Sequence, residues 1–172
     1  KTKKGKKMND ILYSPWRLKY ILSEKENKCI FCDRPSKAED EKHLILYRSQ
    51  FCFVIMNMYP YNNGHLMVVP YQHTSSLTEL SKDEIDNVFE TVQLCESVLR
   101  RNYNPDGINI GMNIGKEAGA GIDEHIHVHI LPRWSGDVNF FSVIGGTRVV
   151  PEAFETAYIQ LKEQFDNARV KK

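Results

Sequence analysis

The sequence of 172 residues lacks any apolar run that approaches the roughly 20 residues a helix needs to cross a bilayer. This absence argues against a membrane-spanning protein. Net charge is also nearly absent, because 23 Lys and Arg oppose 22 Asp and Glu and leave a formal charge of +1. We therefore expect no bulk electrostatic attraction to nucleic acid or to a membrane surface.

Cysteine is scarce, and no secretory signal is recognisable. The basic segment KTKKGKKMND lacks the apolar centre of such a signal. We expect residues 1–13 to form a flexible tail, residues 14–172 to form one domain, and the protein to be cytoplasmic. No disulfide framework is expected in that compartment. Of the four cysteines, Cys52 and Cys95 lie in apolar strand and helix patterns and are predicted to be core residues.

Short segments of strand and helix formers follow one another along the chain. Ser81 and Glu84 form a capping box, and apolar residues recur at helical spacing after it. Helices are predicted over 14–24, from 81 to about 104, and in the tail beyond 151; strands are predicted over 44–48, 51–56, 65–70, 107–114 and 125–131. Strands with short connections around one central helix favour an antiparallel α+β sheet with flanking helices, in a single domain.

Half of the six histidines stand at alternate positions of one short segment, His125, His127 and His129. In a strand, alternate side chains share a face, so the three imidazoles are predicted to line one face. The apolar residues between them would pack into the core on the other face. Three histidines on one face of a strand disfavour a purely structural role.

Two kinds of chemistry suit such a row. A zinc site of all three histidines conflicts with strand geometry, because at about 3.3 Å per residue the outer two are about 13 Å apart. Zinc needs each ligand nitrogen at about 2.0–2.1 Å. A pair could still share a metal with residues from elsewhere in the chain. The other chemistry is covalent catalysis, in which one neutral imidazole is the nucleophile in phosphoryl or nucleotidyl transfer.

Three segments together resemble one known family. HIHVHIL matches the pattern of the histidine-triad family, in which three histidines alternate with apolar residues. NGHLMVVPYQH and GINIGMNIGKEAG are similar to two further segments of that family, so the resemblance spans roughly residues 29–134. It implies a histidine-triad-like antiparallel α+β sheet, a small-molecule nucleotide substrate and a homodimer.

The resemblance also implies roles for single residues. His127 would attack the α-phosphate of a nucleotide and form a nucleotidyl-histidine, and His129 would contact the same phosphate. Asn113 matches an asparagine near the phosphates. Asn57 matches a residue that holds the ribose hydroxyls, although a turn-capping asparagine before Pro60 is an alternative. His127, His129, Asn57 and Asn113 are thus the predicted nucleotide-binding residues.

One position departs from the family pattern. Gly121 stands where many members carry a glutamine that contacts the phosphates. The segment EHIHVH followed by LPRWSGDVNF looks most like the branch of diadenosine tetraphosphate phosphorylases. This resemblance implies cleavage of a nucleoside polyphosphate at its α-phosphate, with phosphate or water as acceptor. An adenylyl phosphoramidase, a non-catalytic nucleotide sensor and a zinc-dependent hydrolase are the alternatives. Trp16, Tyr59 and Trp134 are candidate aromatic walls for the base.

The segment CIFC has the spacing of half a zinc site, Cys29 and Cys32. The alternatives are a redox pair and an inert pair; for the redox pair, no βαβ context for a thioredoxin-like motif is evident. Some histidine-triad proteins complete such a site with two histidines, which correspond here to His73 and His125. The resemblance therefore implies a closed, structural Cys₂His₂ zinc site and no metal in the chemical step. His65 matches a family position that we interpret as structural support.

Overall fold

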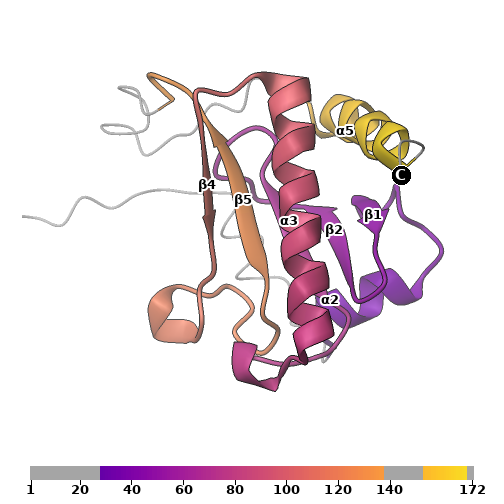
Figure 1. Cartoon of the computed structure of the whole chain (residues 1–172), viewed down its shortest axis with the longest axis vertical. Coiled ribbons are helices and arrows are strands. Elements are labelled where there is room, and N and C mark those ends of the chain that lie inside the picture. The colour runs from indigo at the N-terminus through magenta and orange to yellow at the C-terminus, as the bar shows by residue number, and fades with distance from the viewer. Residues whose placement is uncertain (1–27, 138–152, 170–172) are drawn as a thin grey trace, which may run out of the picture.

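The computed structural model describes residues 28–137 and 153–169 (Figure 1). The predicted tail over 1–13, the domain boundary that follows it and the predicted helix over 14–24 with Trp16 lie outside the described residues. In the described part, no helix has both the length and the apolar character needed to span a membrane.

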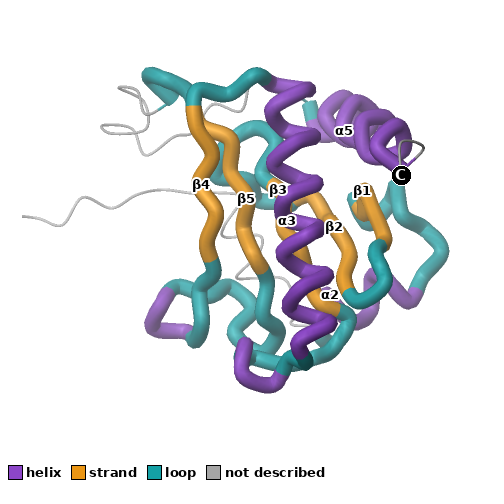
Figure 2. The backbone as a smooth tube through the Cα atoms, in the orientation of Figure 1, coloured by secondary structure: helices purple, strands orange, loops and turns teal. Residues whose placement is uncertain are grey.

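The strands form one antiparallel sheet, as the sequence predicted (Figure 2). Its order is β1-β2-β3-β5-β4, and each neighbouring pair is antiparallel. The first two strands pair with each other as an antiparallel hairpin. The strands are β1 (Ile45–Arg48), β2 (Cys52–Met56), β3 (Leu66–Pro70), β4 (Gly107–Gly111) and β5 (Val128–Arg133).

The helices begin and end where the sequence places caps. Ser81 and Glu84 form the predicted capping box before the longest helix, and Asn104 ends that helix in the left-handed conformation at φ 43°. The helices are α2 (Ile30–Asp33), α3 (Lys82–Tyr103) and α5 (Phe154–Arg169), with 3₁₀ turns η1 (Arg34–Ser36), η2 (Leu77–Glu79) and η3 (Lys116–Ala118).

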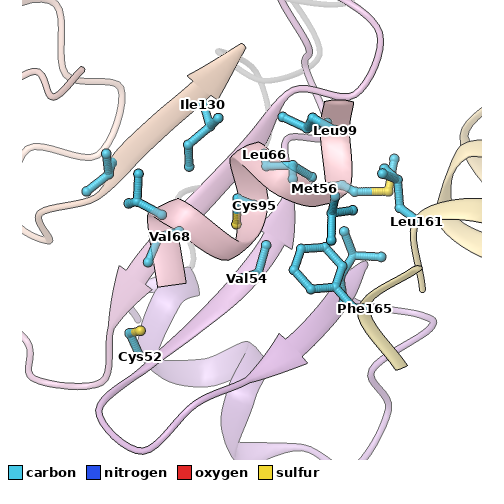
Figure 3. Close-up of a cluster of buried hydrophobic side chains, with 14 of the residues drawn as sticks. Cys52, Val54, Met56, Leu66, Val68, Cys95, Leu99, Ile130, Leu161 and Phe165 are labelled. Carbon is cyan, nitrogen blue, oxygen red and sulfur yellow. The ribbon is translucent and has the colours of Figure 1, made fainter. Parts of the chain in front are cut away.

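The main core lies between one face of the sheet and the pair of helices α3 and α5 (Figures 1 and 3). Alternate residues of β2 and β3, such as Val54 and Leu66, point toward Cys95 and Leu99 of α3. Phe165 extends this core into α5. Cys52 and Cys95 are both fully buried there, which confirms their prediction as core residues.

The opposite face of the sheet carries a second, smaller cluster, which α2 covers. Its members come from strands β1, β2 and β3 together with one helical aromatic residue: Phe31, Ile45, Phe53, Ile55, Met67 and Val69. Strands β2 and β3 are therefore buried on both faces over their whole length. The functional side chains described below lie on this second face.

Two strands differ in extent from the prediction. Strand β5 begins at Val128 rather than at residue 125, and β4 ends at Gly111 rather than at 114. The pairing of β5 with β3 stops near Pro70, which has no N–H to offer the ladder. Instead, the N–H of Ile126 donates to the carbonyl of Thr74 at 2.7 Å, in the loop after β3. Two of the three histidines therefore precede the strand.

Gly64, in the turn between β2 and β3, provides a test of how closely this turn packs against α3. Its φ is +68°, and a Cβ there would lie 2.7 Å from Cε2 of Tyr103. We predict that Gly64→Ala lowers the free energy of unfolding by about 1–3 kcal/mol, because strain and a clash both oppose the new methyl group. Chemical denaturation measures the change. Gly107→Ala is the control, since a Cβ at Gly107 meets no atom within 4 Å; an equal loss in both variants would contradict the prediction.

Candidate active site and metal centre

The four residues predicted to bind zinc come together at one end of the sheet. Cys29 caps the start of α2 and Cys32 lies within that helix, while His73 follows β3 and His125 precedes β5. Their ligand atoms all lie within 4.8 Å of one another. The structure therefore joins three segments that are far apart in the sequence in one Cys/His cluster.

The hydrogen bonds of His125 leave one of its nitrogens free to bind a metal. Its Nε2 lies 2.9 Å from the carbonyl oxygen of Pro70, so Nε2 carries the proton and donates. In the neutral ring Nδ1 then holds a lone pair. That atom lies 3.3 Å from Sγ of Cys29, 3.6 Å from Sγ of Cys32 and 3.3 Å from Nδ1 of His73. The lone pair therefore faces the other three members of the cluster.

The spacing of the four atoms fits a tetrahedral ion. Bonds of about 2.3 Å to sulfur and 2.0–2.1 Å to nitrogen place the ligand atoms of a zinc tetrahedron about 3.3–3.8 Å apart. The distances at His125 fall within or at the edge of this range, as does the 3.3 Å between Sγ of Cys32 and Nδ1 of His73. Both cysteines are free thiols. The donor set therefore suits a divalent metal.

Burial and the neighbouring Cys29 raise the pKa of the Cys32 thiol to about 11. A thiol with that pKa is protonated at neutral pH, whereas a metal ligand must be a thiolate. Without a cation, this cluster therefore keeps Cys32 uncharged.

Among the described residues, His127 makes one ring hydrogen bond, and this bond leaves its other nitrogen with a lone pair. Its ring is 4% exposed, and Nδ1 lies 2.9 Å from the carbonyl oxygen of His125. Since a carbonyl can only accept, Nδ1 carries the proton and Nε2 keeps its lone pair. Burial lowers the pKa of His127, which favours the neutral ring. A neutral imidazole with a free Nε2 is the form that can act as a nucleophile.

His129 lies beside His127, on the sheet face away from α3. In β5 it pairs directly with Met67 of β3, whose side chain belongs to the second cluster. On its other side it pairs with Gly111, which has no side chain to cover it. The rings of His127 and His129 are 4.7 Å apart between centroids. The two imidazoles therefore share one partly open face.

A chain of hydrogen bonds sets the tautomer of His129. The backbone N–H of Tyr61 donates to Nδ1 of His65 at 3.1 Å, and Nδ2 of Asn57 lies 3.2 Å from the same atom. His65 must therefore hold its proton on Nε2, which donates to Nδ1 of His129 at 2.9 Å. His129 then keeps its own proton on Nε2. It is thus able to donate a hydrogen bond to an anion bound beside His127.

The structural support predicted for His65 is thus confirmed and made specific. Its side chain is 1% exposed, and it connects the turn after β2 to β5. Sequence reasoning did not foresee that it fixes a tautomer, because nothing in the pattern NGHL shows which ring it contacts. The sequence analysis also assigned no role to Phe31, because an apolar residue between two cysteines shows no pattern of its own. In the structure its ring contacts His127.

The other predicted residues lie around these rings. Asn57 accepts a hydrogen bond from the N–H of Tyr59 through Oδ1, as in the turn-capping alternative, while its amide group faces His65. Asn113 follows β4 by two residues, and the last residue of that strand, Gly111, pairs with His129. No contact in the structure assigns either asparagine to a ligand.

The candidate aromatic walls and the departure from the family pattern are also placed. Tyr59 is 38% exposed in the turn after β2. Trp134 packs edge-on against Tyr103, so part of its surface is used in packing. Gly121 lies exposed in the loop that precedes β5.

The burial of His129 predicts a pH dependence of stability. Burial, and then the nearby His127, lower the pKa of His129 from 6.5 to about 4. Between these pH values the unfolded chain binds more protons at this histidine than the folded chain does. The contribution of His129 to the free energy of unfolding is therefore complete above about pH 6.5 and is lost as the pH falls toward 4. We predict that the urea midpoint falls more between about pH 7 and 5 in the wild type than in His129→Gln. Equal pH slopes in the two proteins would contradict this account.

The chain is similar to known proteins in sequence. The sequence profile of the HIT domain matches residues 38–136. A protein of Mycobacterium tuberculosis named AP-4-A phosphorylase is 36% identical over 149 residues, which cover 82% of this chain and 76% of that protein. A Saccharomyces cerevisiae protein named bis(5'-adenosyl)-triphosphatase is 33% identical over 91 residues, or 52% of this chain and 44% of the yeast protein.

Solved structures show the same fold. A zinc-bound histidine triad family protein from Mycobacterium smegmatis has a TM-score of 0.68 and 26% identity, and the match covers 84% of this chain and 98% of that one. A hypothetical histidine triad nucleotide-binding protein from Sulfolobus tokodaii has a TM-score of 0.66 and 26% identity, covering 83% and 95%. With its domain profile, its 36%-identical relative and its antiparallel sheet in agreement, the chain belongs to the histidine-triad (HIT) family.

Proposed function

We propose that this protein cleaves a dinucleoside polyphosphate such as diadenosine tetraphosphate at its α-phosphate, through a covalent nucleotidyl-His127. The observation that carries the proposal is the buried imidazole of His127, whose Nδ1–H is held by a carbonyl and whose Nε2 is free. The named activities of the mycobacterial and yeast relatives support this substrate class.

The reaction follows from the two tautomers. Nε2 of His127 attacks the α-phosphorus; a P–N bond forms, and the P–O bond to the polyphosphate leaving group breaks. The ring becomes an imidazolium, which the carbonyl oxygen of His125 stabilises by accepting the Nδ1–H at 2.9 Å. In a second step inorganic phosphate or water attacks the same phosphorus and the P–N bond breaks. His127 is thereby restored.

His129 supplies a donor for the developing charge. Its Nε2–H, fixed by the hydrogen bond from His65, can bind a phosphate oxygen beside His127 without first reorienting. We assign Asn113 to contacts with the phosphate region of the substrate. Asn57 would bind the ribose hydroxyls through the second lone pair of its Oδ1. Because Gly121 has no amide side chain, backbone N–H groups of the preceding loop would contact the remaining phosphate oxygens.

We further propose that the cluster of Cys29, Cys32, His73 and His125 binds one structural zinc ion. Four protein ligands close the coordination shell, which is typical of zinc sites that stabilise a fold rather than react. When bound, the ion would hold the thiolates and join α2 to the segment before β5. The zinc-bound mycobacterial structure and the spacing of the donors support this assignment. The chemistry at His127 needs no metal.

A homodimer through strand β4 is also proposed. This strand is at the edge of the sheet. Ile110 in the strand and Ile114 shortly after it are 46% and 51% exposed. An edge strand with apolar side chains favours pairing with a second copy. Sedimentation equilibrium at micromolar concentration should give twice the chain mass, and a monomer there would contradict the proposal.

Free cysteines in the described part are consistent with a reducing, cytoplasmic location, which stays a prediction.

Product analysis with diadenosine tetraphosphate tests the function. We predict ADP and ATP when inorganic phosphate is present, since phosphate then resolves the nucleotidyl-histidine. AMP and ATP without phosphate would instead identify water as the acceptor. His127→Ala should lower either activity by at least about a thousandfold, because the nucleophile is removed.

The matched control is His43→Ala, which changes a histidine in the turn before β1 and should keep wild-type rates. A wild type that binds AMP but cleaves neither this substrate nor an AMP-amine conjugate would overturn the proposal in favour of a nucleotide sensor. Faster cleavage of the AMP-amine conjugate would identify a phosphoramidase that uses the same nucleophile.

Metal analysis tests the zinc site. Protein purified without chelator should contain about one zinc per chain, and Cys32→Ser should lose it, because a serine hydroxyl does not replace a thiolate ligand. Cys95→Ala is the control: it changes a buried cysteine of the α3 core and should retain the metal. Zinc-free wild-type protein, or full occupancy in Cys32→Ser, would contradict the assignment.

A further inference from the structure

Phe31 lies where the metal cluster meets the catalytic ring. It stands between Cys29 and Cys32 on α2, and its side chain is 1% exposed. Its ring centroid lies 5.0 Å from that of His127 and 5.5 Å from that of His125. One side chain therefore contacts both a proposed metal ligand and the proposed nucleophile.

The ring of His127 is fixed by few groups. One hydrogen bond, from Nδ1 to the carbonyl of His125, determines which nitrogen is free. A single hydrogen bond restricts the side-chain torsions χ1 and χ2 without fixing both, so packing also helps to set the plane of the ring. Among the described residues, the rings in contact with His127 are those of His129, at 4.7 Å, and Phe31. Phe31 thus provides an apolar wall for the imidazole.

The position of Phe31 depends in turn on the cysteines. Helix α2 has only four residues, far fewer than a helix needs to be stable by itself. Its inner side is held by the apolar cluster around Phe31, and its ends carry two members of the Cys/His cluster. An ion bound by both cysteines would therefore fix the helix and, with it, the ring that faces His127.

We propose that Phe31 is a positioning residue, which couples occupancy of the Cys/His cluster to the orientation of the His127 imidazole. The proposal rests on the function inferred above and deepens it, because it gives the structural metal a defined effect on the chemical step. Orientation matters strongly for attack at phosphorus, since a displacement of about 1 Å can cost about a hundredfold in rate.

The test compares Phe31→Leu with Phe53→Leu. Phe53 belongs to the same apolar cluster and is equally buried, but it stacks on Tyr71 at 5.5 Å. In rapid-quench experiments with diadenosine tetraphosphate, Phe31→Leu should form the nucleotidyl-enzyme about tenfold more slowly than Phe53→Leu. Zinc content should be unchanged in both, and KM should change by less than about threefold.

The ¹⁵N chemical shifts of the His127 ring give a readout independent of activity. We expect the His127 resonances to broaden or shift in Phe31→Leu and to stay at their wild-type positions in Phe53→Leu. Substituting Cys32→Ser should disturb the same resonances in the wild type and add little to the change already present in Phe31→Leu. This non-additivity is expected if the coupling passes through the ring.

The outcomes separate the two proposals. If the wild type forms no nucleotidyl-protein, the proposed function fails, and the His127 spectra alone test the coupling. If the wild type forms it and the two leucine variants behave alike, the function stands and the inference is wrong. A raised KM with an unchanged chemical rate in Phe31→Leu would assign the ring to substrate binding and would also overturn the inference.

Discussion

The hydrogen bond from Nδ1 of His127 to the carbonyl oxygen of His125 is the interaction on which the site depends. It determines that Nε2 of His127 keeps its lone pair, and it joins the proposed nucleophile to the backbone of a residue whose own side chain faces two cysteines and a histidine. The same short segment thus serves the proposed metal site with its first imidazole and the proposed chemistry with its second. Its position is set by the loop after β3, through Ile126 and Thr74.

The sheet makes this arrangement rigid. Its central strands are buried on both faces, with α3 and α5 over one face and α2 over part of the other (Figures 1 and 3). A site on a rigid scaffold needs little reorganisation when charge develops on a phosphate. The neutral state of both rings follows from the same burial, which lowers the pKa of His127 and takes that of His129 to about 4.

Much of this was predictable from local patterns. The capping box of Ser81, the strand hairpin and the antiparallel architecture follow from propensity and spacing. The spacing of the two cysteines and the family resemblance of the two histidines predicted the four members of the Cys/His cluster, which the structure brings together. The ends of β4 and β5 were not predicted correctly, because the ladder stops for tertiary reasons at Pro70. Periodicity alone extends both strands too far.

The tautomers and the role of Phe31 could not have been predicted in this way. Which nitrogen of His129 carries a proton depends on a backbone N–H in another turn, at Tyr61, acting through His65. A contact between residues 31 and 127 likewise arises only when α2 folds against the segment that precedes β5. Sequence patterns indicate which residue types are present and at what spacing. The chemistry here depends on distances between segments that are not neighbours in the sequence.

The most direct measurement is peptide mapping by mass spectrometry after the reaction is stopped with alkali, which preserves a phosphorus–nitrogen bond to histidine. Protein mixed with diadenosine tetraphosphate without added phosphate should carry an adenylyl group on the peptide that contains residues 125–129, at His127. An adenylyl group on another residue, or turnover with no labelled protein at the earliest times, would contradict nucleophilic catalysis by His127.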